Sequence, residues 1–179
     1  MRRIATALCI CVTACAGARK SARPLLGPDL DDAASGAEDP GVSVESVRIQ
    51  GHALRPHARC SAVVRQRSGA VRCPGAGHLA WAYAPDPATA LDQRDFVAAR
   101  VAELAGQQHA RLQRAEFDCE IAATPGSCRA YVVSGSSGTW SEVIGLAPVE
   151  RGSLLAECVS LPGKAAFMKP VCSDVFGVR

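Results

Sequence analysis

One long stretch of the chain, about residues 91–114, repeats apolar side chains at three- and four-residue spacing. This period matches an α-helix, so the stretch predicts an amphipathic helix with one apolar face for packing. Asp86 and Pro87 suit its N-cap and first helical position, with Thr89 and Asp92 as a competing capping arrangement. The apolar stripe consists of Phe96, Val97, Val101, Leu104, Ala105 and Leu112.

The segment before this helix alternates apolar and polar residues, as half-buried β-strands do. Residues 42–49 indicate an opening strand with a shift in register, and residues 60–67 and 71–73 indicate a hairpin that turns at Ser68-Gly69. In residues 79–83 the large side chains alternate with alanines, which predicts a strand that buries them in the core. The large side chains are Leu79, Trp81 and Tyr83.

The segment after the helix is typical of a β-meander, in which short apolar runs alternate with turn residues. Residues 165–176 fit either a short terminal helix interrupted by Pro170 or a last strand. The predicted fold class is therefore α+β, with an antiparallel sheet packed against one main amphipathic helix. The expected strands are residues 116–121, 128–134, 140–146 and 153–160, with turns at 124–126, 135–138 and 148–152.

The first fourteen residues show the layout of a secretory signal peptide. Arg2 and Arg3 precede an uncharged, mostly apolar run over residues 4–13. As a helix this run would span about 15 Å, which is half of a hydrocarbon core, so a permanent transmembrane anchor is not expected.

The last four residues of this segment, Val12-Thr13-Ala14-Cys15, resemble the lipobox of bacterial lipoproteins. The resemblance implies lipidation of the Cys15 thiol, cleavage after Ala14 and acylation of the new amino terminus, which together anchor a protein stably to a membrane. The alternative is an ordinary signal peptide, because Ala14 also suits standard cleavage. Ala16 replaces the Asp that retains many lipoproteins in the inner membrane, which favours the outer membrane of a bacterial cell envelope.

Three parts are expected along the chain: a signal peptide over residues 1–14, a lipidated Cys15 with a flexible tether to residue 41, and one domain over 42–179. The tether has few large apolar side chains and cannot bury enough surface to offset its ordering entropy. Two of the 20 basic residues lie in the signal peptide, which leaves 18 against 17 acidic residues. This balance implies no global electrostatic partner.

The cysteines indicate a disulfide-stapled domain. Of nine, Cys9 and Cys11 lie in the signal peptide and Cys15 would carry lipid. The six remaining cysteines are an even number, which in an exported chain predicts three disulfides. The absence of a C-x-x-C motif argues against a thioredoxin-like site or a zinc knuckle. We favour nearest-neighbour pairing, although a tight turn at Pro125-Gly126 would place Cys119 opposite Val132. The candidates are Cys60, Cys73, Cys119, Cys128, Cys158 and Cys172.

The sequence predicts no catalytic residue, metal or cofactor. Residues 135–138 have the wrong spacing for a nucleophile elbow and are typical of a turn. His52 and His57 give only a weak metal pattern, typical of surface histidines. Glu142 and Glu157 fall on adjacent predicted strands and could face each other as a carboxylate pair.

An acid-free, arginine-rich stretch is the strongest candidate for binding. No acidic residue lies between Glu45 and Asp86. A positive patch there would suit lipid headgroups, lipopolysaccharide, peptidoglycan carboxylates or the acidic tether, whereas nucleic acid is excluded by the lack of interleaved aromatics. The alternative is a set of solvated arginines that discourages pairing of strand edges. The candidate patch comprises Arg55, Arg59, Arg65, Arg67 and Arg72.

Two functions follow from these features. The first is a non-catalytic binding or structural module displayed at a membrane, and the second is a small envelope hydrolase whose site is assembled from distant residues. The closing part of the chain, with its strand-turn-strand over residues 140–160 and a final segment rich in Phe and Val, is similar to PsbP-like envelope lipoprotein domains. That resemblance implies an α+β fold, although six cysteines are not part of the family's pattern.

Overall fold

A computed structural model of the chain describes residues 47–55 and 58–178. The predicted signal peptide, Cys15 and the tether lie outside the described residues. The elements in chain order are β1 (Arg48–Ile49), β2 (His52–Ala53), β3 (Ser61–Arg65), β4 (Ser68–Cys73), β5 (Gly77–Ala84), α2 (Pro87–Gln107), β6 (Arg111–Ile121), β7 (Thr124–Gly135), β8 (Gly138–Val149), β9 (Gly152–Ser160), α3 (Ala165–Ser173) and β10 (Phe176–Val178).

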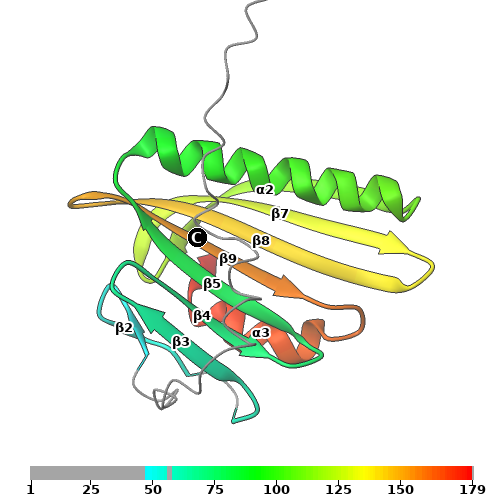
Figure 1. Cartoon of the computed structure of the whole chain (residues 1–179), viewed down its shortest axis with the longest axis horizontal. Coiled ribbons are helices and arrows are strands. Elements are labelled where there is room, and N and C mark those ends of the chain that lie inside the picture. The colour runs from blue at the N-terminus through cyan, green and yellow to red at the C-terminus, as the bar shows by residue number, and fades with distance from the viewer. Residues whose placement is uncertain (1–46, 56–57, 179) are drawn as a thin grey trace, which may run out of the picture.

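The fold is mostly antiparallel β-sheet. Eight strands form one sheet in the order β10-β6-β7-β8-β9-β5-β4-β3, and β1 and β2 form a separate two-residue pairing (Figure 1). Helix α2 runs along one face of the large sheet, and helix α3 lies on the other. The predicted combination of antiparallel strands with a main helix is therefore present, together with a second helix in the segment that the sequence left open between helix and strand.

Both faces of the sheet are buried by apolar side chains. Because successive residues of a strand point to opposite faces, one strand supplies both cores. On β5, for example, Ala80 and Ala82 face α2, whereas Leu79 and Trp81 belong to the core that contains α3. The small alanines allow α2 to lie close to the sheet, and Trp81 is 3% exposed, as expected of a core residue.

Helix α2 begins earlier and ends earlier than its apolar pattern predicted. Asp86 is the N-cap, and its side chain accepts a hydrogen bond from the Thr89 backbone N–H at 2.8 Å. The helix stops at Gln107 and the chain reverses through His109, which has a left-handed φ of 49°. Predicting helix over residues 108–114 was wrong because Leu112 also fits the two-residue period of β6, where it packs against the α2-side core.

Two predicted turns are shifted toward the N-terminus. The β3–β4 hairpin turns at residues 66–67, so Gly69 lies inside β4. The β6–β7 hairpin turns at Ala122 and Ala123, whose φ values of 48° and 64° lie in the left-handed region. Pro125 and Gly126 are therefore strand residues, and the predicted turn at 124–126 was wrong. The ambiguous segment 165–176 contains helix α3 and the first residue of β10.

Three disulfides join nearest neighbours in sequence: Cys60–Cys73, Cys119–Cys128 and Cys158–Cys172. The position of the β6–β7 turn explains the second bond. With the turn at residues 122–123, Cys119 pairs with Gly126, and Cys128 lies two residues further along the same face of the neighbouring strand. The two Cα atoms are then 5.9 Å apart, within the range that a disulfide spans.

Candidate functional site

The structure divides the predicted arginine patch into separate groups. Arg65 ends β3 and Arg67 lies in the following turn, and both side chains are exposed. The Arg67 carbonyl accepts a hydrogen bond from the Tyr83 N–H at 2.8 Å, which places this turn beside the C-terminal end of β5. Arg65 and Arg67 are therefore brought together at one end of the sheet.

The other three predicted arginines lie elsewhere. Arg72 pairs with Ser61 at the opposite end of the β3–β4 hairpin, and Arg59 precedes that end by two residues. Arg55 is held next to the end of helix α3, because its backbone N–H donates to Asp174 Oδ2 at 2.6 Å. The five arginines thus do not share one surface, and a binding role for them stays a prediction.

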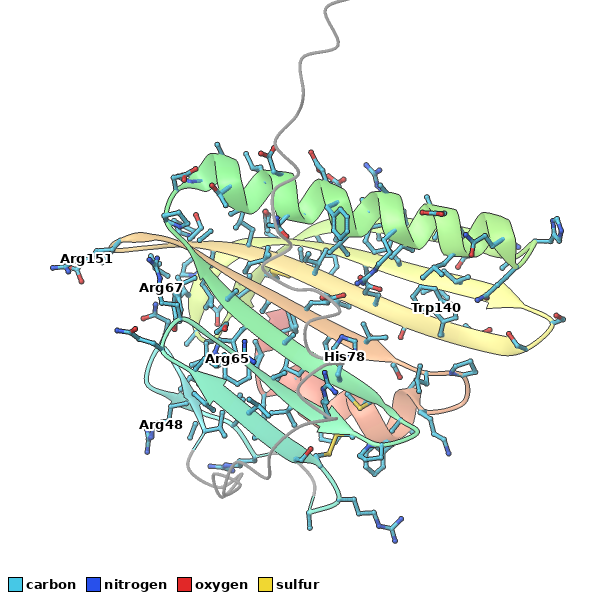
Figure 2. The ribbon with its side chains drawn as sticks, viewed as in Figure 1. Arg48, Arg65, Arg67, His78, Trp140 and Arg151 are labelled. Atoms are coloured by element: carbon cyan, nitrogen blue, oxygen red, sulfur yellow. A yellow bond between two sulfur atoms is a disulfide. The ribbon has the colours of Figure 1, made fainter. Side chains whose placement is uncertain are left out.

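Arg151, which the sequence pattern did not indicate, lies at the same end of the sheet as Arg65 and Arg67. It occupies the β8–β9 turn, and the neighbouring Gly152 lies against the Ala84 carbonyl at the end of β5. Strands β9, β5 and β4 are adjacent, so about 10 Å separates β9 from β4. Figure 2 shows Arg67 and Arg151 at this end. We call Arg65, Arg67 and Arg151 the basic end.

Acidic residues lie near the basic end, but within the described part of the chain none of them forms an ion pair with its arginines. Glu150 is exposed in the same turn as Arg151. Asp86 is engaged as the cap of α2, where Thr89 donates to it through both its N–H and its hydroxyl. These hydrogen bonds lower the pKa of Asp86, so the cap stays ionised at neutral pH.

A second cluster lies buried between helix α2 and the sheet. Glu142 on β8 and Glu157 on β9 are each only 2% exposed, and both accept from one nitrogen of Arg100. The Arg100 Nη2 atom is 2.8 Å from Glu142 Oε1 and 2.5 Å from Glu157 Oε1. The structure therefore brings together the two carboxylates that the sequence placed on adjacent strands, and it adds Arg100 of α2. We call these three residues the buried ion cluster.

The register of β8 and β9 explains why the carboxylates meet. Glu142 pairs with Val159, and Glu157 pairs with Ile144, so the two carboxylates are diagonal neighbours on the α2 face. Diagonal side chains on one face remain within reach of each other when they are long. Tyr131 lies directly opposite Glu142 on β7, and its buried hydroxyl has no hydrogen-bond partner among the described residues.

The charges of the buried ion cluster do not balance if both carboxylates are ionised. Burial and, to a smaller extent, the neighbouring Glu157 raise the pKa of Glu142 while Arg100 opposes the shift, and the net result is a pKa of about 9. Burial alone would lower the pKa of Arg100, but the two carboxylates more than offset this effect and raise it. The cluster therefore sets one guanidinium against two buried carboxyl groups.

Two further polar contacts dock α2 on the sheet. Arg129 of β7 donates to Asp95 of α2 at 2.8 Å and lies 2.9 Å from Glu116 of β6. Arg94 of α2 donates to the Ser127 hydroxyl at 3.3 Å. Unlike the buried ion cluster, these contacts lie at the edge of the helix, where Asp95 and Glu116 are exposed.

Candidates for metal binding and nucleophilic catalysis gain no support. Within residues 47–55 and 58–178, no group of three or more His, Cys, Asp or Glu side chains is arranged to hold a metal ion. His52 lies on β2, while His57 lies outside the described residues. Ser136 and Ser137 form a simple two-residue hairpin turn between β7 and β8.

We found no protein-family model and no curated protein that matches this sequence. In the described part of the chain, neither helix is long and apolar enough to cross a membrane.

Proposed function

We propose that this protein is a lipid-anchored bacterial envelope lipoprotein whose folded domain is a non-catalytic binding or structural module. The observation that carries the proposal is the division of the nine cysteines. Cys15 completes the lipobox, and all six cysteines of the folded domain are joined in three disulfides. Disulfides persist in oxidising compartments outside the cytoplasm, which agrees with an exported chain. Attachment is through lipid on Cys15, and no cofactor is required.

The partner that best suits the domain is an anionic component of the envelope. The basic end presents three exposed arginines at neighbouring turns, and residues 47–85 contribute no acidic residue. Such a surface attracts phosphate or carboxylate groups even when the whole chain is almost neutral. Nucleic acid is not proposed, because the compartment does not supply it and aromatics are not interleaved with the arginines.

A small envelope hydrolase is the second candidate, and one observation favours it: the carboxylates of Glu142 and Glu157 converge. Their geometry nevertheless suits structure better than hydrolysis. Glycosidases hold their two carboxyl groups about 5 to 9.5 Å apart around the scissile bond, whereas these two both accept from one guanidinium nitrogen beneath α2. A substrate would have to displace the helix to reach them.

The decisive experiment for the anchor is an intact mass of the detergent-extracted protein, alkylated with and without prior reduction. We expect a chain that starts at Cys15 and carries three acyl chains, with six cysteines alkylated only after reduction. The Cys15→Ser variant is the control and should carry no lipid. A wild-type mass without lipid, or thiols that react before reduction, would contradict the proposal.

Membrane choice has its own test, because the proposal places the protein in the outer membrane. Ala16 follows the lipidated cysteine, so wild-type protein should fractionate with outer membranes on a density gradient. Ala16→Asp should move it to the inner-membrane fraction. Wild-type protein in the inner-membrane fraction would refute this part of the proposal.

A further inference from the structure

The buried ion cluster contains an imbalance that the fold has to resolve. Two carboxylates that are each 2% exposed face a single guanidinium, and they contact the same Nη2 atom. If both were ionised, one negative charge would remain under helix α2 without compensation. An uncompensated buried charge is far more costly than a protonated carboxyl, so such sites bind a proton instead.

We propose that Glu142 retains its proton at neutral pH beside Glu157 and Arg100, and that helix α2 is therefore held on the sheet more tightly in acid than in alkali. When α2 lifts, water reaches both carboxylates, and the open form releases the proton to solvent. The closed form keeps it. Raising the pH therefore favours the open form by mass action.

The direction follows from the number of protons that each state binds. The pKa of Glu142 is shifted upward, so the contribution of its proton is fully present below the ordinary range of a glutamate and is lost as the pH rises to about 9. Across that window the equilibrium constant for opening α2 rises by up to about tenfold per pH unit, and above it the constant levels off.

Several other ionisable groups lie around Glu142 and Glu157. The ionisable side chains that face Glu142 are Arg100 from α2, Glu157 from β9 and the phenol of Tyr131 from β7. Beyond Tyr131 on the same row of the sheet lies Arg114 of β6, which is paired with Glu116. On the other side, His78 of β5 lies opposite Val159, the partner of Glu142, so this nearby imidazole needs its own control.

Hydrogen exchange of the α2 backbone amides, corrected for intrinsic rates between pH 5 and 9, tests the proposal in the full chain. In wild type we expect the opening constant of α2 to rise steeply with pH. Glu142→Gln keeps the hydrogen bonds but cannot ionise, so its α2 opening should be nearly independent of pH. Asp92→Asn, an exposed carboxylate change on the same helix, should leave the wild-type slope intact.

Three results would overturn the proposal: an equal slope in wild type and Glu142→Gln, a slope removed by Asp92→Asn, or a slope removed by His78→Gln. A second measurement needs no variant. The infrared carbonyl band of a protonated carboxylic acid should be present in wild-type protein at pH 7 to 8, where exposed carboxyl groups are ionised. Absence of that band would refute the retained proton on Glu142 even if Glu142→Gln fails to fold.

Discussion

Trp81 of β5 lies directly over Gly69 of β4, its partner across the strands. A Cβ atom on Gly69 would overlap the Trp81 ring, so only glycine leaves the indole room to lie flat against the sheet. The pair sits on the α3 side of the sheet, where Trp81 joins the larger of the two cores. Gly69 is therefore a packing residue of β4 rather than a turn residue.

The space around each glycine predicts opposite effects for two glycine-to-alanine changes. Gly69→Ala should lower the free energy of unfolding by about 1 to 3 kcal/mol, because it overpacks a buried aromatic. Gly106→Ala should raise it by about 0.5 to 1 kcal/mol, because Gly106 lies in α2 with open space around the added methyl group. Urea unfolding of both variants checks the pair, and a stable Gly69→Ala would show that Trp81 can move.

Much of the β-structure could be predicted because one rule, the two-residue alternation, governs both faces of every strand. The positions of the turns were harder to predict. At the β6–β7 turn the sequence offers Pro125 and Gly126, yet the chain reverses at two alanines in left-handed conformation. The prediction failed there because the disulfide and the packing of Ile121 and Cys128 outweigh the local preference of the turn residues.

The buried ion cluster was half predictable. Placing Glu142 and Glu157 on adjacent strands required only the alternation and an approximate turn. Arg100 was missed because a charged residue is expected on the solvent-exposed side of an amphipathic helix, although it lies three residues after Val97 and therefore near the buried face. Arg151 could not be linked to Arg67 from the sequence, because the link depends on the strand order β9-β5-β4.

The strained turn predicts a stabilising change. Ala123 is exposed and has a φ of 64°, a conformation that costs an L-residue about 1 kcal/mol relative to glycine. Ala123→Gly should therefore raise the thermal midpoint, with a gain of about 0.5 to 1 kcal/mol. Ala99→Gly, an exposed change inside α2, should cost about 1 kcal/mol. A loss of stability in Ala123→Gly would contradict the left-handed turn.

Breaking the buried ion cluster should cost more than replacing it. Arg100→Met leaves two buried carboxylates without their cation and should destabilise the protein by about 3 to 5 kcal/mol at pH 7. The triple change Arg100→Met, Glu142→Leu and Glu157→Leu removes all three ionisable side chains and should recover most of that loss. Chemical unfolding at pH 7 compares the two. Equal losses in both variants would show that the cluster acts through packing rather than charge.

The Cys158–Cys172 disulfide is the covalent tie between helix α3 and strand β9. Removing it with paired alanines should cost about 3 kcal/mol and should increase hydrogen exchange in α3 before the sheet is affected. The Cys60–Cys73 bond closes a loop of similar length but ties together the neighbouring strands β3 and β4. Removing it should therefore leave α3 protected from exchange. If both variants showed the same hydrogen-exchange rates in α3, the Cys158–Cys172 bond would have no local role there.

The basic end gives the most direct prediction about function. In the Cys15→Ser background, which removes the lipid, reversing Arg65, Arg67 and Arg151 to Glu should weaken binding to anionic vesicles or lipopolysaccharide about a hundredfold, because each arginine near such a surface contributes about 1 kcal/mol. The matched control reverses Arg111, Lys164 and Lys169, which are exposed on β6 and at α3 and change the net charge equally. The control should bind almost as well as its parent, and the parent should lose affinity with salt. An equal loss in the two triple variants would mean that total charge, and not the basic end, governs binding.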